Sequence, residues 1–330
     1  PAAERSVRQR TTQTVVVTGI AGRIGGGIGS ALRALGHRVV GVDMVELPPG
    51  VLHHRCDAYV RCNLAAACDA GEAHDALATA MKGAHAAVHC AAWPGPSATP
   101  PPAVVASGAA NRKPGIGLED ASPSVLLRDN MAATSAICDA AIGAGVERVV
   151  FSSSAFAIGW SHAAAGPQAF VPKYLPVDEA HGALPFETYG LSKHLGEQVL
   201  EASARTARTA SFVSLRFTNI VKRELWGTVP WAAPTAAAPL TLLLWAYTHE
   251  DDVIDAHVAA VSRAAAAAPG THEAYIIAAP DTRFAEPTLP LLSSVLGVEG
   301  LPLRAPMDGN ASPLSARKAI EPAECPAQSA

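Results

Sequence analysis

Short, continuous apolar runs recur along the chain and are separated by polar or glycine-containing segments. Runs of this length, without strict alternation of apolar and polar residues, are typical of strands buried on both faces of a sheet. We predict such strands at 14–19 (TVVVTG), 37–43 (HRVVGVD), 85–92 (HAAVHCAA), 146–154 (VERVVFSSS) and 210–217 (ASFVSLRF).

Helical segments are predicted between these runs, at 25–35, 72–82, 124–144 and 188–204. Alternation of strand and helix at this spacing indicates βαβ units, whose strands are parallel and whose crossovers are right-handed. The predicted fold class is therefore α/β, a doubly wound parallel sheet of the Rossmann type followed by a smaller C-terminal subdomain.

Two regions break the alternation. Residues 94–123 are rich in Pro, Gly, Ala and Ser, which predicts a long loop that is either a lid or a disordered excursion. Residues 280–330 hold many prolines and predict short helices and loops. We therefore divide the chain into a flexible tail (1–13), a core (14–217) and a C-terminal subdomain (218–330), with a late strand near 274–277 that returns to the core.

Composition excludes several classes of protein. The net charge of −4 offers no basic surface for nucleic acid, and six scattered cysteines predict reduced thiols rather than a disulfide framework. Residues 231–246 are apolar, but Pro234 and Pro239 interrupt them, so no membrane span is predicted.

None of the twelve histidines has the spacing of a metal ligand, and His89 is expected to be a hydrogen-bonded core residue. Residues 1–13 lack the apolar region of a secretory signal, so a cytoplasmic location is expected, or organelle import if they are the remnant of a transit peptide.

A glycine-rich loop follows the first predicted strand and opens the first helix. Gly19, Gly22 and Gly25 have the spacing GxxGxxG, with Arg23 and Ile24 between the last two. Glycines at such a turn let backbone N–H groups approach a pyrophosphate, and the positive end of the helix dipole adds to the attraction. The loop therefore predicts a dinucleotide-binding site.

Asp43 ends the second predicted strand, 18 residues after Gly25. An acid at this position accepts hydrogen bonds from the adenosine ribose hydroxyls and repels a 2′-phosphate, which favours NAD over NADP. Arg23 and Arg38 leave NADP as the less favoured alternative, because an arginine near that pocket would hold the phosphate.

The chain resembles the extended short-chain dehydrogenases/reductases, in the NAD-dependent epimerase/dehydratase group. The resemblance rests on TGIAGRIG at 18–25, VHCAAW at 88–93, FSSSAFAIG at 151–159, YGLSK at 189–193 and LRFTN at 215–219. These motifs occur in the family's order and spacing over residues 14 to about 260. The resemblance implies an NAD-dependent enzyme with a small-molecule substrate. It also implies that residues 14–217 form the NAD-binding core and that residues 218–330 form a mainly substrate-binding subdomain. The family often dimerises through a four-helix face, which makes a homodimer a possible assembly.

The resemblance also implies roles for particular residues. Ser154, Tyr189 and Lys193 match the catalytic residues, and Asn130 matches an asparagine with a structural or proton-relay role. Ala91 and Ala92 match positions along which the cofactor lies, and Asn63 with Leu64 stands where the family usually has Asp-Leu against the adenine. The predicted substrate pocket draws on the stretches after the fifth and sixth strands, with Trp160, Lys173, Tyr174 and Arg223 as candidates.

Tyr189 and Lys193 are four residues apart, so they share one face of a helix. The resemblance implies that the tyrosine transfers a proton to or from the substrate oxygen and that the nicotinamide carries the hydride. We expect the lysine to lower the pKa of the phenol and to hold the nicotinamide ribose, so that Tyr189 and Lys193 also bind the cofactor. Ser154 is expected to hydrogen-bond the same substrate oxygen.

Several chemistries within the family use this site. Dehydratases place an Asp-Glu pair after the catalytic hydroxyl residue, where this chain has Ala155-Phe156, so dehydration is not expected. The favoured interpretation is a dehydrogenase or reductase acting on a hydroxyl or carbonyl, with a sugar-like substrate as one possibility. The alternatives are an NAD-dependent sugar or nucleotide-sugar epimerase and, in another class, a dinucleotide-binding sensor or assembly subunit without catalysis.

Overall fold

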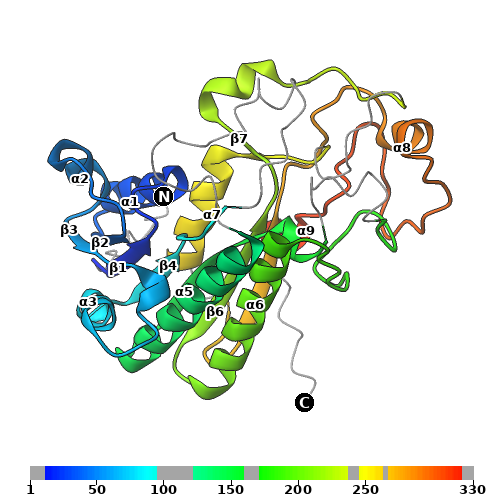
Figure 1. The fold of residues 1–330 in the computed structure, drawn as a ribbon. Coiled ribbons are helices and arrows are strands. Elements are labelled where there is room, and N and C mark those ends of the chain that lie inside the picture. The colour runs from blue at the N-terminus through cyan, green and yellow to red at the C-terminus, as the bar shows by residue number, and fades with distance from the viewer. Residues whose placement is uncertain (1–11, 95–121, 160–170, 237–244, 263–266, 322–330) are drawn as a thin grey trace, which may run out of the picture.

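The computed structural model describes residues 12–94, 122–159, 171–236, 245–262 and 267–321 (Figure 1). Nearly all of the predicted loop at 94–123 and of the tail at 1–13 lies outside these ranges, as does Trp160.

Seven parallel strands form the central sheet, in the order β3-β2-β1-β4-β5-β6-β9. Their bounds are β1 Thr14–Thr18, β2 Arg38–Asp43, β3 Ala58–Arg61, β4 Ala86–His89, β5 Arg148–Ser154, β6 Ser211–Phe217 and β9 His272–Ile277. The chain leaves β1 in one direction to β2 and β3 and then crosses to β4 on the other side of β1. This reversal between β1 and β4 is the switch point at which open α/β sheets bind ligands, at the carboxyl ends of the strands.

Helices cover both faces of the sheet (Figure 1). One face carries α3 (Glu72–Met81), α5 (Pro123–Gly143) and α6 (Thr188–Thr206), and the other carries α1 (Arg23–Ala34) and α7 (Glu250–Ser262). Successive side chains of a strand point to opposite faces, so Val16 packs with the first group of helices while Val15 and Val17 pack with the second. The predicted α/β Rossmann class is confirmed.

The sequence did not predict α2 (Pro49–Arg55), which has no buried residue and hence no apolar periodicity to reveal it. Short 3-10 turns follow three strands, at η1 (Leu64–Ala66), η3 (Ala155–Ala157) and η4 (Arg223–Thr228). None of the helices in the described ranges is long and apolar enough to cross a membrane.

Residues after β6 build a smaller layer beyond the carboxyl ends of the strands. There β7 (Ile220–Val221) pairs with β8 (Thr248–His249), and α8 (Thr288–Leu296) follows β9. The short helix α9 (Arg317–Ile320) instead lies along the edge strand β9, where Lys318 donates to Glu273 and to the carbonyl of Ala274. A separate apolar cluster holds this layer together and joins Trp245, Phe284 and Leu292 to Ala155 and Phe156, which directly follow β5. The layer is thus packed against the end of the strand that carries the predicted catalytic serine.

Candidate active site

The glycine loop joins β1 to α1 at the switch point of the sheet. Gly19 has a φ of +69°, and a Cβ at this position would lie 2.8 Å from the backbone nitrogen of Ala91. A Cβ on Gly25 would overlap the carbonyl oxygen of Gly19. Both positions therefore require glycine, because any side chain would separate the loop from the end of β4 or from the start of α1.

The first turn of α1 has the properties of an anion-binding site. Gly22 is the N-cap, no side chain caps the helix, and the first turn contains no acidic residue. The leading N–H groups of a helix have no partner within the helix, and the helix dipole makes this end positive. Arg23 and Ile24 begin the helix, so the loop and the helix start fit a dinucleotide pyrophosphate.

Asp43 ends β2 beside this loop. Its Oδ2 accepts a hydrogen bond from the backbone N–H of Ala21 at 2.9 Å, and its Oδ1 accepts one from Val45 at 3.2 Å. These bonds fix the carboxylate and leave further lone pairs for two hydroxyl donors. The position fits the predicted role as an acceptor for ribose hydroxyls.

Neither arginine that suggested NADP is placed to bind a 2′-phosphate beside Asp43. The guanidinium of Arg23 donates to both carboxylate oxygens of Glu250, at 2.6 and 2.7 Å, so its charge is already paired with α7. Arg38 begins β2, about 16 Å from Asp43 along an extended strand. The predicted contact of Arg23 with the cofactor is therefore restricted to its backbone at the start of α1.

Arg55, at the end of α2, holds the glycine loop through hydrogen bonds to its carbonyl groups. The sequence analysis did not predict this role. The Nη1 of Arg55 donates to three consecutive carbonyl oxygens, those of Ile20 (3.0 Å), Ala21 (2.7 Å) and Gly22 (3.2 Å). One cation bound to three carbonyl groups holds the loop in a single conformation. No sequence signal indicated this role, because α2 itself was not recognised.

The remaining predicted cofactor residues lie at the same edge of the sheet. Asn63 caps η1 through its Oδ1, which accepts from Ala65 at 3.2 Å, and its side chain stays exposed, whereas Leu64 is buried. Ala91 and Ala92 follow β4; Ala91 is half-buried and Ala92 is exposed. These residues therefore surround the switch point, as their predicted roles require.

A buried polar chain fixes the end of β4. The hydroxyl of Thr18 hydrogen-bonds Nδ1 of His89 at 2.9 Å, and Nε2 of His89 lies 3.4 Å from the hydroxyl of Thr134 on α5. Burial lowers the pKa of His89 to about 3, so the ring is neutral at physiological pH. The structure confirms His89 as a hydrogen-bonded core residue.

Asn130 has mainly a structural role in this arrangement. Its Oδ1 accepts from the backbone N–H of Trp93 at 2.7 Å, and its Nδ2 donates to the Trp93 carbonyl at 3.2 Å and to the Ser192 hydroxyl at 3.0 Å. Its amide therefore joins the segment after β4 to α6. Because Ser192 precedes Lys193, these bonds also hold the helix turn that carries the predicted catalytic lysine.

The structure brings Ser154, Tyr189 and Lys193 together at the carboxyl end of β5. Ser154 is the last residue of β5 and is 5% exposed; its Oγ accepts a hydrogen bond from the backbone N–H of Phe156 at 3.3 Å, and its hydroxyl neighbours the Tyr189 phenol. The Tyr189 ring packs edge-on against Phe156, with 5.5 Å between centroids. Lys193 is 4% exposed; its Nζ donates to the Ser152 carbonyl at 2.8 Å and lies 5.5 Å from the centroid of the Tyr189 ring.

Burial shifts the pKa values of both titratable groups toward their neutral forms. It raises the pKa of the Tyr189 phenol, and the nearby charge of Glu187 raises it further, while the hydrogen bond with Ser154 acts in the opposite direction. Burial also lowers the pKa of Lys193 to about 8. The pKa of Tyr189 is therefore raised in this structure and not lowered as expected, because desolvation and the charge of Glu187 dominate.

Two acids that the sequence analysis left unassigned position α6. Glu187 is the N-cap, and its carboxylate accepts from the backbone N–H of Tyr189 at 2.8 Å and from that of Gly190. Glu197 lies one turn after Lys193, is 2% exposed, and binds the Arg216 guanidinium through both oxygens at 2.9 and 2.6 Å. Spacing offered a signal for both, since Glu187 precedes the helix and Glu197 follows Lys193 by four residues.

The other candidates for the substrate pocket do not converge on one site. Tyr174 donates to Asp178 at 2.6 Å and is stacked under Arg304, whose guanidinium carbon lies 3.5 Å from the ring centroid. Arg223 forms an exposed ion pair with Asp251 at the start of α7. In the described ranges, these side chains are therefore engaged in local contacts.

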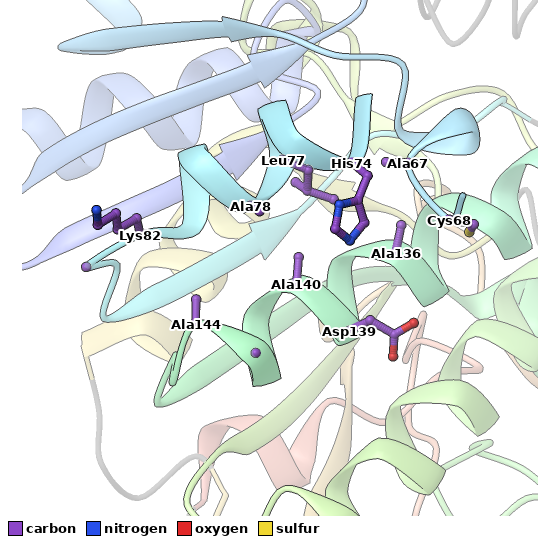
Figure 2. A pocket seen from close by; sticks show the side chains of 12 residues that line it. Ala67, Cys68, His74, Leu77, Ala78, Lys82, Ala136, Asp139, Ala140 and Ala144 are labelled. Carbon is purple, nitrogen blue, oxygen red and sulfur yellow. The ribbon is translucent and has the colours of Figure 1, made fainter. Parts of the chain in front are cut away.

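A cavity of about 460 Å³ lies between α3 and α5 (Figure 2). Ala136, Ala140 and Ala144 form one wall, and His74 and Leu77 of α3 form part of the other. None of its lining residues is a predicted catalytic or cofactor residue. Small side chains on α5 leave this space, and it belongs to the outer surface of the sheet layer.

The glycine loop forms a dinucleotide site at the switch point between β1 and β4, and the phenol of Tyr189 and the ammonium group of Lys193 lie at the end of the neighbouring strand β5. This is the arrangement of the short-chain dehydrogenase/reductase class. The chain belongs to the NAD dependent epimerase/dehydratase family, whose model matches residues 15–278. The resemblance inferred from the motifs is confirmed, and with it the assignment to a family of NAD-dependent enzymes.

Individual relatives are distant. A UDP-glucose 4-epimerase of Azospirillum brasilense is 28% identical over 41% of this chain and 42% of its own length. The chain thus spans about two fifths of the length of the curated relatives it matches.

Solved structures share the fold. A short-chain dehydrogenase/reductase superfamily protein of Agrobacterium tumefaciens with bound NAD has a TM-score of 0.61 at 22% identity, over 93% of this chain and 90% of that one. A UDP-glucose-4-epimerase of Stenotrophomonas maltophila, with bound NAD and formylated UDP-arabinopyranose, has a TM-score of 0.60 at 21% identity, over 93% and 91%.

Proposed function

We propose that this protein is an NAD-dependent oxidoreductase that transfers a hydride between the nicotinamide and a hydroxyl or carbonyl group of a small, sugar-like substrate. The observation that carries the proposal is the meeting of Ser154, Tyr189 and Lys193 at the carboxyl end of β5, where α6 packs against η3. A scaffold that only bound a dinucleotide would have no need for a buried phenol, hydroxyl and ammonium in this position.

The chain's own residues suit the binding of NAD. The glycine loop and the start of α1 would hold the pyrophosphate, and Asp43 would accept hydrogen bonds from the adenosine ribose. When bound, NAD supplies the hydride acceptor or donor. Arg55 keeps the loop in shape through its three carbonyl contacts.

Ser154 and Tyr189 would act on one substrate oxygen. In the reductive direction, the neutral phenol favoured by burial is ready to donate its proton to the developing alkoxide, while the serine hydroxyl donates a hydrogen bond to it. In the oxidative direction, the phenolate must form before it takes the proton of the hydroxyl. Positive charge beside the ring favours that phenolate, and Lys193 is the ammonium group placed to supply it.

An epimerase that removes and returns the same hydride is the second candidate. It is supported by the family and by the matches to UDP-glucose 4-epimerases. The same Ser-Tyr-Lys group would serve both chemistries. The difference lies in whether the oxidised product leaves before the hydride returns.

One experiment distinguishes the candidates. The NAD-loaded protein is mixed with a panel of polyols, uronates and UDP-sugars, and NADH absorbance and the sugar products are both followed. We expect net NADH formation with at least one polyol or uronate. Interconversion of two sugars without net NADH formation would favour the epimerase. If neither reaction occurs although NAD is bound, the protein is a dinucleotide-binding protein without catalysis.

A further inference from the structure

Arg23, the first residue of α1, has its charge paired with an acid 227 residues further along the chain. It is the only charged residue between Thr18 and Leu32. Side chains of a helix lean toward its N-terminus, so an arginine at this position ordinarily lies beside an anion bound there. Here the guanidinium instead donates from Nε and Nη2 to the two carboxylate oxygens of Glu250, at 2.6 and 2.7 Å.

Glu250 is fixed from two sides. It lies in the first turn of α7, is 8% exposed, and also accepts a hydrogen bond from the backbone N–H of Arg223 at 3.1 Å. Burial alone would raise the pKa of Glu250, but the hydrogen bonds from Arg23 and Arg223 outweigh burial and lower it. The dipole of α7 favours the same charged form. The carboxylate therefore stays ionised at neutral pH and remains bound to Arg23.

Close packing of α1 on α7 keeps the two charges together. A Cβ on Gly27 would lie 2.6 Å from Cδ1 of Ile254, so the helices approach closely at this point. The Arg23 side chain is 28% exposed and that of Glu250 is 11% exposed. A two-point contact between a guanidinium and a carboxylate is directional, and partial burial reduces its screening by salt.

The ion pair removes one positive charge from the dinucleotide site. The N–H groups of the glycine loop and the dipole of α1 still attract a pyrophosphate. A free arginine at the helix start would add a charge-assisted hydrogen bond, worth about 10-fold or more in affinity. Arg23 and Glu250 together carry no net charge. NAD is therefore bound less tightly than the loop sequence would allow.

We propose that Glu250 weakens dinucleotide binding by keeping Arg23 away from the pyrophosphate, so that the reduced dinucleotide is released after each turnover. A dehydrogenase must exchange NADH for NAD in every cycle, whereas an epimerase returns the hydride to the substrate and gains nothing from release. Glu250 acts through Arg23 and is a positioning residue. The need for release rests on the proposed function, but the effect on dinucleotide binding does not.

The test measures binding to the full-length protein by calorimetry, without turnover, with NAD, ADP-ribose and adenosine. Glu250→Gln keeps the size of the side chain and removes its charge, which frees Arg23. NAD and ADP-ribose should bind about 10-fold more tightly to this variant, whereas adenosine, which has no phosphate, should bind as it does to the wild type. The release of NADH, followed by stopped-flow displacement, should slow by a similar factor.

Two further variants show whether Arg23 carries the gain. Arg23→Gln/Glu250→Gln removes both charges and should bind NAD with wild-type affinity. Asp251→Asn is the matched control, because Asp251 lies in the same turn of α7 and its loss frees the exposed guanidinium of Arg223. Asp251→Asn should leave the affinity for NAD unchanged.

The proposal fails if Glu250→Gln binds NAD no more tightly than the wild type, if adenosine gains equally, or if the gain persists in the double variant. Weaker NAD binding in the double variant than in the wild type would also contradict it, since Arg23 would then contact the pyrophosphate in the native protein. That comparison decides the matter if Glu250→Gln does not fold.

The outcomes also separate this inference from the proposed function. Tighter NAD binding in Glu250→Gln, with no NADH formed from any substrate of the panel, would refute the proposed function alone. NADH formation by the wild type, with unchanged NAD affinity in Glu250→Gln, would refute this inference alone.

Discussion

We propose that Asp43 is the residue that most directly determines the choice of dinucleotide. Its carboxylate is held by two backbone N–H groups, and neither Arg23 nor Arg38 provides a cation beside it. A fixed negative charge at this point attracts ribose hydroxyls and repels a 2′-phosphate. Selection between NAD and NADP is therefore expected to depend on this one side chain.

We predict that Asp43→Asn weakens NAD binding by about 10- to 100-fold, the usual worth of a hydrogen bond to a charged group. The affinity for NADP should fall less or rise, because repulsion of the 2′-phosphate is removed. Fluorescence titration of both dinucleotides measures the ratio. Asp57→Asn is the control, since Asp57 bonds the start of β2 and Arg33 instead; an unchanged ratio in Asp43→Asn would show that another residue sets the preference.

Single residues also show where sequence reasoning reached its limit. The positions of Ser154, Tyr189 and Lys193 followed from motif spacing, because β5 and α6 bring those spacings to one edge. The pKa of Tyr189 did not follow, because spacing reveals a neighbouring charge but not the depth of burial. Arg55 contacts carbonyl groups 33 to 35 residues away in the sequence, and Glu250 contacts Arg23 at a separation of 227 residues. No local sequence pattern predicts such contacts.

At the scale of elements, α7 is bound to the sheet by a buried histidine. His257 is fully buried; its Nε2 lies 2.7 Å from the hydroxyl of Ser152 on β5, and its Nδ1 lies 2.6 Å from the carbonyl of Val253. Because a carbonyl only accepts, Nδ1 carries the proton and Nε2 accepts from the serine. Burial lowers the pKa of His257 to about 4, so the helix is joined to the sheet through a neutral ring.

This attachment makes stability depend on pH. The pKa of His257 is about 4 when folded and about 6.5 in an unfolded chain. The unfolded state therefore takes up a proton first as the pH falls, and the contribution is present above about pH 6.5 and lost between about 6.5 and 4. His89 acts in the same direction, since burial lowers its pKa to about 3.

The free energy of unfolding is expected to fall between pH 7 and pH 5. We predict that this fall is about 2 kcal/mol smaller in His257→Gln than in the wild type. Urea unfolding at the two pH values measures this difference, independently of any constant loss from the substitution. His74→Gln, at a half-exposed position on α3, is the control. An identical pH dependence in His257→Gln and the wild type would contradict a buried neutral ring.

The elements were predictable to different degrees. The strands β1, β2, β4, β5 and β6, the end of β9 and the helices α1, α3, α5 and α6 were visible as apolar runs and periodic segments, because each is packed against the core on at least one face. The strand β3 was not predicted, since none of its residues is fully buried. The helix α2 and the two-residue strands β7 and β8 were not, since they bury too little or are too short to form a pattern.

The whole molecule combines a sheet that binds the dinucleotide with a smaller layer that covers the ends of its strands. The parallel sheet places the glycine loop, Asp43 and the catalytic residues at one edge, because the carboxyl ends of all seven strands lie there. The layer after β6 adds a second cavity, lined by Trp226, Tyr247 and Phe284 among others. Sequence alone indicated this division but not the pocket, whose residues come from four separate stretches of chain.

Proton transfer by Tyr189, in step with hydride transfer, is central to the proposed function. The most direct test is the single-turnover rate of NADH formation in Tyr189→Phe, with the best substrate of the panel. The substitution removes one hydroxyl, so NAD affinity and folding should survive, while the rate should fall by about 10²- to 10⁴-fold, the usual worth of a positioned acid or base. Tyr275→Phe, which removes a hydroxyl from β9 outside the site, should keep the wild-type rate. A near-normal rate in Tyr189→Phe would contradict this role for the tyrosine.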